Sequence, residues 1–148
     1  MNYIDVKIKK LNEKAITPTY GSEFSAGADL YACLNDDVEI SPNETKFIKT
    51  GISVEIPEGF VLLVFARSGL SCKQGLAPAN KVGVVDSDYR GEVVVVLHNH
   101  STETRKISHG DRIAQMVIVP YFKANFEEVT TLSSTVRGEG GFGSTGKK

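Results

Sequence analysis

The C-terminal end of the chain concentrates residue types that bind phosphate. Its last twelve residues, RGEGGFGSTGKK, hold five glycines, two hydroxyls, three cationic side chains and one phenylalanine. Glycines allow backbone N–H groups to approach an anion closely, and hydroxyls and cations bind phosphate oxygens. The ring of Phe142 could stack on a nucleobase. These residues are compatible with a phosphate-binding arm, but taken alone they fit a disordered, solubilising tail better, as is common for Gly-rich termini.

Two nucleotide-binding patterns overlap in this segment, and we expect neither to operate. The spacing GxGxxG occurs over 138–143, and GxxxxGK occurs over 141–147. Both motifs place phosphate at the N-terminus of a helix that follows them. Only Lys148 follows in the sequence, at the position where a P-loop carries Ser or Thr.

Four other polar segments separate the apolar runs: Ala26–Tyr31, Ala66–Leu70, Gly83–Gly91 and His109–Gln115. In the second of them an arginine, a hydroxyl and glycine N–H groups follow the most apolar run of the chain, and together they make a plausible phosphate cradle. Each segment alone also has an ordinary explanation. An aspartate often caps its own turn, and neighbouring Asp and Arg residues can form an exposed ion pair of little consequence.

The apolar residues that must position these segments recur with a period of two. The runs are Val6–Ile8, Val38–Ile40, Phe47–Ile48, Ile52–Ile56, Phe60–Phe65, Val93–Leu97 and Ile113–Val119. Short β-branched runs separated by Gly, Pro, Asn or Asp predict many short strands, and thus an all-β barrel or sandwich. Only Ser68–Gln74 could form a turn or two of helix. Because Val93–Leu97 is apolar at successive positions, we expect a second sheet or another subunit to cover its outer face.

Length and composition favour one globular domain without a membrane or nucleic-acid partner. We expect a single β domain over 1–132 and a flexible Gly-rich arm over 133–148. The formal net charge of −1 argues against general binding to nucleic acid or membrane surfaces. Cys33 and Cys72 have no zinc-site spacing, which fits a reduced compartment. Because the first residues, MNYIDVKIKKLNEKA, lack an apolar signal region, we expect a cytoplasmic protein, or a nuclear or organellar one in a eukaryote.

In this order, the polar segments and the terminal arm closely resemble the trimeric dUTPase family. The most specific matches are GVVDSDYRG at 83–91, GDRIAQ at 110–115 and RGEGGFGSTG at 137–146. The resemblance implies a jelly-roll-like β-barrel subunit, a homotrimer with active sites at subunit interfaces, and Mg²⁺-dependent hydrolysis of dUTP to dUMP and pyrophosphate. Such an enzyme keeps uracil out of DNA and supplies dUMP for dTMP synthesis.

The resemblance assigns the base, the sugar and the attacking water to one segment. Asp86 matches the acid that orients and deprotonates the water, a task suited to a carboxylate acceptor. Asn80 matches the uracil reader, because its amide offers both a donor and an acceptor. Tyr89 matches the ring beneath the deoxyribose, which leaves no room for a 2′-hydroxyl. The backbone near Val85 is expected to exclude the thymine methyl group.

The remaining assignments concern the phosphates. The resemblance places Ser68, Gly69 and Gln115 on the α- and β-phosphates, with Arg67 as cationic support. Asp29 is expected to act on Mg²⁺ through water, since this ion keeps much of its water shell. Arm residues would grip the γ-phosphate and cover the base; they are Arg137, Phe142, Gly143, Ser144 and Thr145. Asp111 and Arg112 receive only an interface or supporting role.

Two other functions are compatible with parts of this sequence. A dCTP deaminase, alone or combined with dUTPase activity, would share the fold, but residues 80–86 contain no glutamate for proton transfer at cytosine. A regulatory protein that senses dUTP would keep the same pocket.

His98 and His100 have a spacing that could bind metal, but no third ligand is evident, so we expect surface histidines. Cys72 has no evident partner base and is not expected to be a nucleophile.

Overall fold

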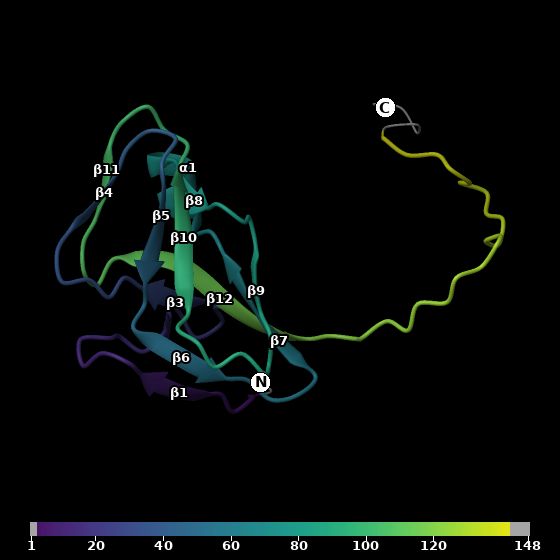
Figure 1. Ribbon diagram of the computed structural model, residues 1–148, viewed down its shortest axis with the longest axis horizontal. Coiled ribbons are helices and arrows are strands. Elements are labelled where there is room, and N and C mark those ends of the chain that lie inside the picture. The colour runs from purple at the N-terminus through teal and green to yellow at the C-terminus, as the bar shows by residue number, and fades with distance from the viewer. Residues whose placement is uncertain (1–2, 143–148) are drawn as a thin grey trace.

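The computed structural model describes residues 3–142 of the chain, and strands dominate this part (Figure 1). One short helix interrupts them. The elements are β1 (Lys7–Lys10), β2 (Thr19–Tyr20), β3 (Ala28–Tyr31), β4 (Val38–Ile40), β5 (Thr45–Lys49), β6 (Ile52–Glu55), β7 (Phe60–Phe65), α1 (Ser68–Gln74), β8 (Leu76–Pro78), β9 (Gly83–Val85), β10 (Val94–Asn99), β11 (Arg105–Ile107) and β12 (Arg112–Pro120). The predicted all-β fold with one short helix is confirmed.

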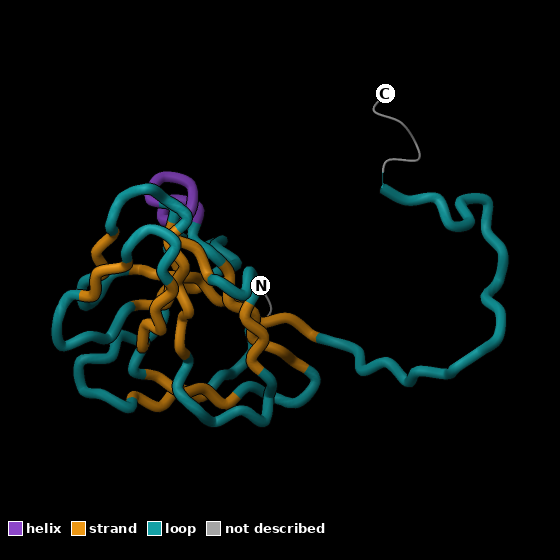
Figure 2. Tube along the Cα trace, turned by 45° about the horizontal axis from the view of Figure 1, so that its top comes forward, coloured by secondary structure: helices purple, strands orange, loops and turns teal. Residues whose placement is uncertain are grey.

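The strands form antiparallel sheets that surround a common interior (Figure 2). The largest has the order β2-β3-β12-β7-β9, and a second has the order β5-β10-β8. Two-stranded sheets, β1-β6 and β11-β4, complete the body. Most neighbours are distant in sequence, as where β12 pairs with both β3 and β7. This topology brings the ends of β3, β7 and β12 to one place, where several of the predicted site residues lie.

The core consists of aliphatic side chains from nearly every strand. Its largest fully buried aliphatic members are Leu30, Ile40, Ile48, Ile52, Leu62, Leu76, Leu97, Ile107 and Ile113. Burying one such side chain contributes about 1.5–3 kcal/mol. In β10 the inward residues Val95 and Leu97 alternate with partly exposed Val94 and Val96. Within residues 3–142, the outer face of β10 is therefore covered only in part.

The helix predicted over 68–74 is confirmed, and several strands were missed. Helix α1 ends at Gly75, whose left-handed backbone (φ 71°) donates its N–H to the last turn. Strands β2, β3, β8 and β11 have only two to four residues each. Such short segments show no clear alternation, because pairing with longer neighbours defines them.

The last strand ends at Pro120, and the chain beyond it leaves the body. Residues 121–142 contain no helix or strand and extend away from the sheets (Figure 1). Phe122, Phe126, Leu132 and Phe142 are almost fully exposed along this segment. The boundary expected near residue 133 stays a prediction. Among the described residues, no helix has the length and hydropathy needed to span a membrane.

Candidate active site

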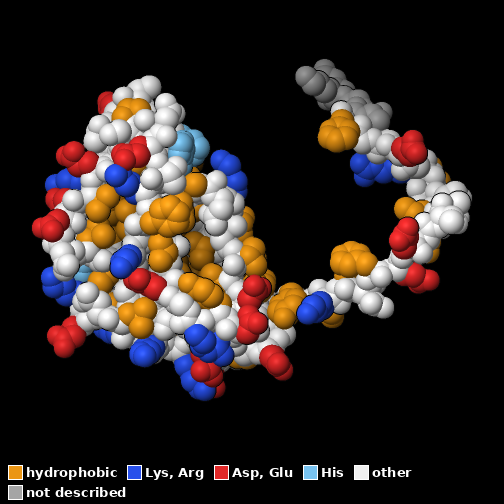
Figure 3. Space-filling view, viewed as in Figure 1, with side chains coloured by type: hydrophobic (Ala, Val, Ile, Leu, Met, Phe, Trp, Pro, Cys, Tyr) orange, Lys and Arg blue, Asp and Glu red, His pale blue; other side chains and the backbone are white. Residues whose placement is uncertain are grey.

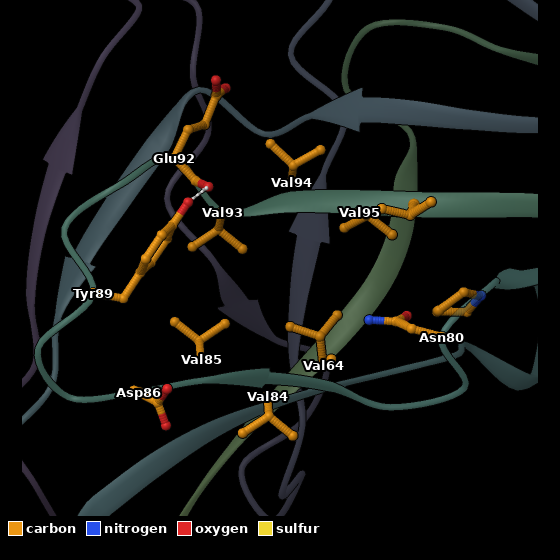
Figure 4. Close-up of a pocket in the computed structure, with 13 residues that line it drawn as sticks. Val64, Asn80, Val84, Val85, Asp86, Tyr89, Glu92, Val93, Val94 and Val95 are labelled. Atoms are coloured by element: carbon orange, nitrogen blue, oxygen red, sulfur yellow. Dashed lines mark hydrogen bonds between the residues drawn. The ribbon is translucent and has the colours of Figure 1, made fainter.

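An apolar pocket of about 250 Å³ opens between β9 and β10. Strand β9 is hydrogen-bonded to β7 and β10 to β5 and β8, so the two strands belong to different sheets and diverge. Buried Val64, Val93 and Val95 line the space between them, and we call this space the valine pocket (Figure 4). Because β9 is an edge strand, it presents backbone N–H and C=O groups that have no strand partner on that side. These groups could recognise the edge of a planar ligand.

Asn80 lies at one end of the valine pocket, with its amide directed inward (Figure 4). The tight turn that carries it is held by backbone hydrogen bonds, from Ala79 N–H to the Val96 carbonyl and from Lys81 N–H to the Pro78 carbonyl. Lys81 itself adopts a positive φ of 65°. The turn therefore ties the predicted base reader to β10 and fixes where its donor and acceptor lie.

Tyr89 lies at the opposite end of the pocket, next to the predicted catalytic acid. Its hydroxyl donates to the Glu92 carbonyl at 3.0 Å, and its N–H donates to the Asp86 carbonyl at 3.2 Å. A Cβ at Gly91 would overlap the Tyr89 ring. Glycine at this position is therefore required for the ring to lie where it does.

The Asp86 carboxylate is exposed at the mouth of the valine pocket (Figure 4). It follows the last residue of β9, so the edge strand sets its position. Among residues 3–142, no donor is hydrogen-bonded to its side-chain oxygens. Asp86 thus has acceptor capacity available for a water molecule or a ligand hydroxyl.

A second, more polar pocket of about 430 Å³ collects the predicted phosphate-binding residues. We call it the arginine pocket; it is lined by Gly21, Ser25, Ala26, Gly27, Asp29, Arg67, Ser68, Gly69, Arg112 and Gln115. Strand pairing explains the assembly, because Gln115 on β12 lies opposite Asp29 on β3 and Phe65 on β7. Arg67 follows two residues after Phe65. Segments far apart in sequence therefore meet on β3, β12 and β7, the three central strands of the five-stranded sheet.

Two arginines share the carboxylate of Asp29 in the arginine pocket. Arg67 Nε donates to Oδ1 at 2.7 Å, and Arg112 Nη1 donates to Oδ2 at 3.3 Å. Asp29 is 8% exposed, so its charge is neutralised where water access is limited. Together the three groups carry one excess positive charge into the pocket. Such an arrangement suits an anionic ligand.

Gln115 and the first turn of α1 supply further polar groups. Gln115 Nε2 donates to the Ala66 carbonyl at 2.9 Å, which directs its amide along the pocket wall. A Cβ at Gly27 would lie 2.5 Å from Gln115 Oε1, so only glycine leaves room for this amide. Arg67 caps α1 without a side-chain hydrogen bond. The backbone N–H groups of Ser68 and Gly69 therefore have no capping acceptor and can bind an anion.

The arm residues that the structure describes, up to Phe142, line neither pocket of the same chain. Arg137 Nε donates to the Gly140 carbonyl at 2.8 Å, and Phe142 is fully exposed. Neither residue lines the valine pocket or the arginine pocket. The predicted contacts of Gly143, Ser144 and Thr145 lie outside the described residues.

Two polar residues of these pockets were not predicted as site residues from the sequence. Arg112 received only a supporting role, and Glu92 received none. Arg112 lines the arginine pocket and pairs with Asp29, whereas Asp111 instead accepts the Ser108 N–H. Glu92 lines the valine pocket, although residues 80–86 lack a glutamate. Its carboxylate accepts the Gly51 N–H at 2.8 Å, which commits it to a structural contact. Glu92 directly follows the motif at 83–91, and this position in the sequence could have indicated that it lies near the pocket.

Comparisons with known proteins agree with the geometry. The dUTPase family profile matches residues 13–146. A deoxyuridine 5′-triphosphate nucleotidohydrolase of Nautilia profundicola is 49% identical, with 96% of this chain and 99% of that protein covered. The dUTPase of Staphylococcus bacteriophage 80alpha, solved with dUPNHPP, is 30% identical with a TM-score of 0.87, covering 96% of this chain and 98% of that one. It is described among phage dUTPases that control transfer of virulence genes by a proto-oncogenic G protein-like mechanism.

A further structure, of a mutant dUTPase from phage phi11 of S. aureus, is described as revealing the coordination of a structural Mg(II) ion. It is 27% identical with a TM-score of 0.80, and the match covers 88% of this chain and all of that one. The family match, the near full-length relative and the shared architecture lead to one conclusion. The chain belongs to the dUTPase family.

Proposed function

We propose that the protein hydrolyses dUTP to dUMP and pyrophosphate. The observation that carries the proposal is the presence, on a chain of the dUTPase family, of an apolar pocket with an amide at one end and a separate cationic pocket. The first suits a nucleobase and its sugar, and the second suits a chain of phosphates. Relatives that bear the name deoxyuridine 5′-triphosphate nucleotidohydrolase support the choice of substrate.

The valine pocket accounts for selection of the base. Asn80 can donate to one uracil carbonyl and accept from the ring N–H, because an amide has both functions. A soft apolar pocket discriminates a methyl group by only about 1–3 kcal/mol. The backbone of β9 near Val85 is a harder wall, and it is proposed to exclude the thymine methyl.

Tyr89 accounts for selection of the sugar. Its ring is proposed to lie beneath the deoxyribose, where a 2′-hydroxyl would collide with it. The hydroxyl of Tyr89 is anchored on Glu92, and Gly91 allows the ring to pack closely. The ring therefore cannot move away from a 2′-hydroxyl without breaking a hydrogen bond. We therefore expect strong discrimination against ribonucleotides.

Asp86 is proposed to act as the general base. Its carboxylate orients a water molecule and accepts a proton from it as the water oxygen bonds to the α-phosphorus. The bond from the α-phosphorus to the oxygen that bridges to the β-phosphorus then breaks, and this oxygen leaves with pyrophosphate. Arg67, the Ser68 and Gly69 N–H groups and Gln115 are proposed to hold the phosphates in line for this displacement.

We propose that Mg²⁺ binds together with the triphosphate. Among residues 3–142 no group of three or more His, Cys, Asp or Glu side chains could hold a metal. A single nearby carboxylate, that of Asp29, fits an ion that keeps most of its water and is held mainly by phosphate oxygens. Asp29 still has lone pairs beyond those that accept from Arg67 and Arg112, so it could contact a water ligand. When bound, the ion would neutralise charge on the phosphates.

The proposed enzyme is a homotrimer in which neighbouring copies complete each active site. The valine and arginine pockets share no lining residue, and the described segment after Pro120 runs away from the sheets (Figure 1). A second copy could bring its arginine pocket to the valine pocket of the first, and an arm could cover both. Arg137, Ser144 and Thr145 would then bind the γ-phosphate, and Phe142 would stack on uracil.

Pyrophosphate release from dUTP, dTTP, UTP and dCTP, with and without Mg²⁺, tests the proposed reaction. We expect rapid release from dUTP alone, and only with the metal. Conversion of dCTP to dUTP or dUMP would instead identify a deaminase. Equal rates with dUTP and UTP would remove Tyr89 from its role, and a monomer in light scattering would contradict the shared site. In cells the reaction would keep uracil out of DNA and supply dUMP, and we place it in the cytoplasm.

A regulatory function is a second candidate, favoured by the description of the phage 80alpha dUTPase. Such a protein would bind dUTP and signal its presence to a protein partner. The two functions separate experimentally, because a sensor needs binding but not turnover. A chain that binds a nonhydrolysable dUTP analogue without releasing pyrophosphate from dUTP would support the sensor.

A further inference from the structure

The chain that follows the proposed sugar-binding tyrosine is hydrogen-bonded to the turn between β5 and β6. The Glu92 carboxylate accepts the Gly51 N–H at 2.8 Å. Val93 donates its own N–H to the Ile52 carbonyl at 2.8 Å. The Thr50 hydroxyl donates to the Val93 carbonyl. These hydrogen bonds join two segments that lie about 40 positions apart, and we call them the turn clamp.

The turn between β5 and β6 is itself fixed by the core. Thr50 is 1% exposed, and Gly51 is buried with a left-handed φ of 69°. A Cβ at Gly51 would lie 2.8 Å from Cys33 Sγ and 2.9 Å from Ala15 Cβ, so this turn packs directly against both side chains. The direction of the Gly51 N–H is therefore set by the core, and the turn clamp gives Glu92 a fixed position.

Glu92 connects this turn with the Tyr89 ring. Figure 3 shows acidic side chains spread over the surface of one face of the body, whereas Glu92 is only partly exposed. Its carboxylate points away from the valine pocket, and its carbonyl faces Tyr89 (Figure 4). That carbonyl accepts the Tyr89 hydroxyl at 3.0 Å. The side chain of Glu92 is therefore bound to the core and its main chain to the ring.

We propose that Glu92 and Thr50 are positioning residues that set the discrimination between deoxyribose and ribose. The inference rests on the proposed function, in which the Tyr89 ring lies beneath the sugar. The ring can reject a 2′-hydroxyl only if it does not yield, and its hydroxyl is held by a carbonyl whose place the turn clamp fixes. Neither side chain needs to touch the nucleotide, because both act through the position of the ring.

Substitutions in the turn clamp should change the choice of sugar but not the choice of base. Glu92→Ala removes the acceptor of the Gly51 N–H, so we expect the ratio of kcat/KM for dUTP over UTP to fall by roughly three- to tenfold. Glu92→Gln keeps an acceptor oxygen and should largely restore the ratio. Thr50→Val should lower it and Thr50→Ser less. The ratio for dUTP over dTTP should stay constant, because the base is read from Asn80 and β9, which are held by β10 and β7.

A double-mutant cycle tests whether the effect passes through the ring. Tyr89→Phe should lower the ratio for dUTP over UTP at least as far as Glu92→Ala. Without the hydroxyl, the Glu92 carbonyl no longer holds the ring, so adding Glu92→Ala to Tyr89→Phe should change the ratio little further. Independent effects that multiply would contradict the proposal.

Glu44 provides the matched control for loss of a carboxylate acceptor. Its carboxylate accepts the Ser41 N–H, also at 2.8 Å, and it lines neither the valine pocket nor the arginine pocket. Glu44→Ala should lower stability and leave both ratios unchanged. A similar shift of the sugar ratio in Glu44→Ala would mean that lost stability, and not the turn clamp, alters specificity.

Pyrophosphate release by each variant gives the two ratios, with circular dichroism and light scattering to confirm fold and assembly. If Glu92→Ala does not fold, Thr50→Val and Thr50→Ser decide by the same measure. A parent that discriminates against UTP, with an unchanged ratio in the folded variants, would overturn the role of the turn clamp alone. A parent that releases no pyrophosphate from dUTP would contradict the proposed function instead. The Kd values of nonhydrolysable dUTP and UTP analogues then give the same comparison without turnover.

Discussion

The guanidinium of Arg67 donates to the carboxylate of Asp29 at 2.7 Å, across 38 positions of sequence. Asp29→Asn removes the charge that holds Arg67 and Arg112 at the edge of the arginine pocket. Because Arg67 is a quarter exposed, we expect a loss of about 1–3 kcal/mol in the free energy of unfolding rather than the larger cost of a fully buried pair. The KM for dUTP should rise as the arginines disperse. Denaturant unfolding and steady-state kinetics measure the two effects.

Asp37 provides the control for this substitution. Its pair with Lys106 is similar in length, at 2.9 Å, but both side chains are about half exposed. Exposed pairs contribute little, so Asp37→Asn should change stability by less than about 1 kcal/mol and leave kinetics unchanged. Equal effects of the two substitutions would mean that Asp29 has no special role in the pocket.

Asp86→Asn tests the general base. The amide keeps the shape of the carboxylate but cannot accept the proton of the attacking water. We expect kcat to fall by about 10²–10⁴ while the Kd for a nonhydrolysable dUTP analogue changes little. Asp88→Asn is the control, because Asp88 lies in the same turn but does not line the valine pocket. A variant at position 86 with undiminished kcat would exclude this carboxylate from catalysis.

Gly91→Ala tests the packing of Tyr89. The added methyl group would occupy space that the ring now fills, so the ring must move and its hydrogen bond to Glu92 must break. We expect the ratio of kcat/KM for dUTP over UTP to fall. Tyr89→Phe keeps the ring and removes only the hydroxyl, so it should reduce the ratio less. An unchanged ratio in Gly91→Ala would show that another group reads the sugar.

The regular elements and the composition of the pockets were largely predictable from sequence, but their contacts were not. Strand β7 and helix α1 were recognisable because an apolar run ends at polar Arg67 and the helix ends at Gly75. The pairing of Arg112 with Asp29 spans 83 positions. No local pattern indicates it, since it arises from the register between β3 and β12.

The same limit applies to His98 and His100. Their spacing was visible in the sequence, but the hydrogen bond between His98 and the distant Thr45 was not, because it depends on the pairing of β5 with β10. Strand β3 was missed for a related reason. Its four residues, ADLY, contain a charged side chain whose burial is possible only with the two arginines beside it.

Glu44 makes part of the stability dependent on pH. Hydrogen bonds from Lys46 and from the Ser41 backbone lower the pKa of its carboxyl below the ordinary value of 4.5. A carboxyl with a lowered pKa stabilises the fold above its ordinary value, and this contribution is lost as pH falls through the folded-state pKa. Glu44→Gln should therefore be less stable than the parent at neutral pH, with a difference that shrinks in acid. Thermal melts from pH 7 to about pH 3 measure this difference, and parallel curves would contradict it.

The arm provides the last test of the proposed site. Deleting residues 137–148 should abolish most dUTP hydrolysis and leave the oligomer intact in light scattering, because the deletion leaves the sheets untouched. Phe142→Ala is the sharper change, since stacking of one base on an aromatic ring contributes about 1–3 kcal/mol. We expect kcat/KM to fall by roughly 5- to 150-fold. Phe24→Ala is the control, because Phe24 is 80% exposed and lines neither pocket. If the truncated chain kept normal rates, the arm would have no part in closing the site, and Arg137 and Phe142 would lose their proposed contacts.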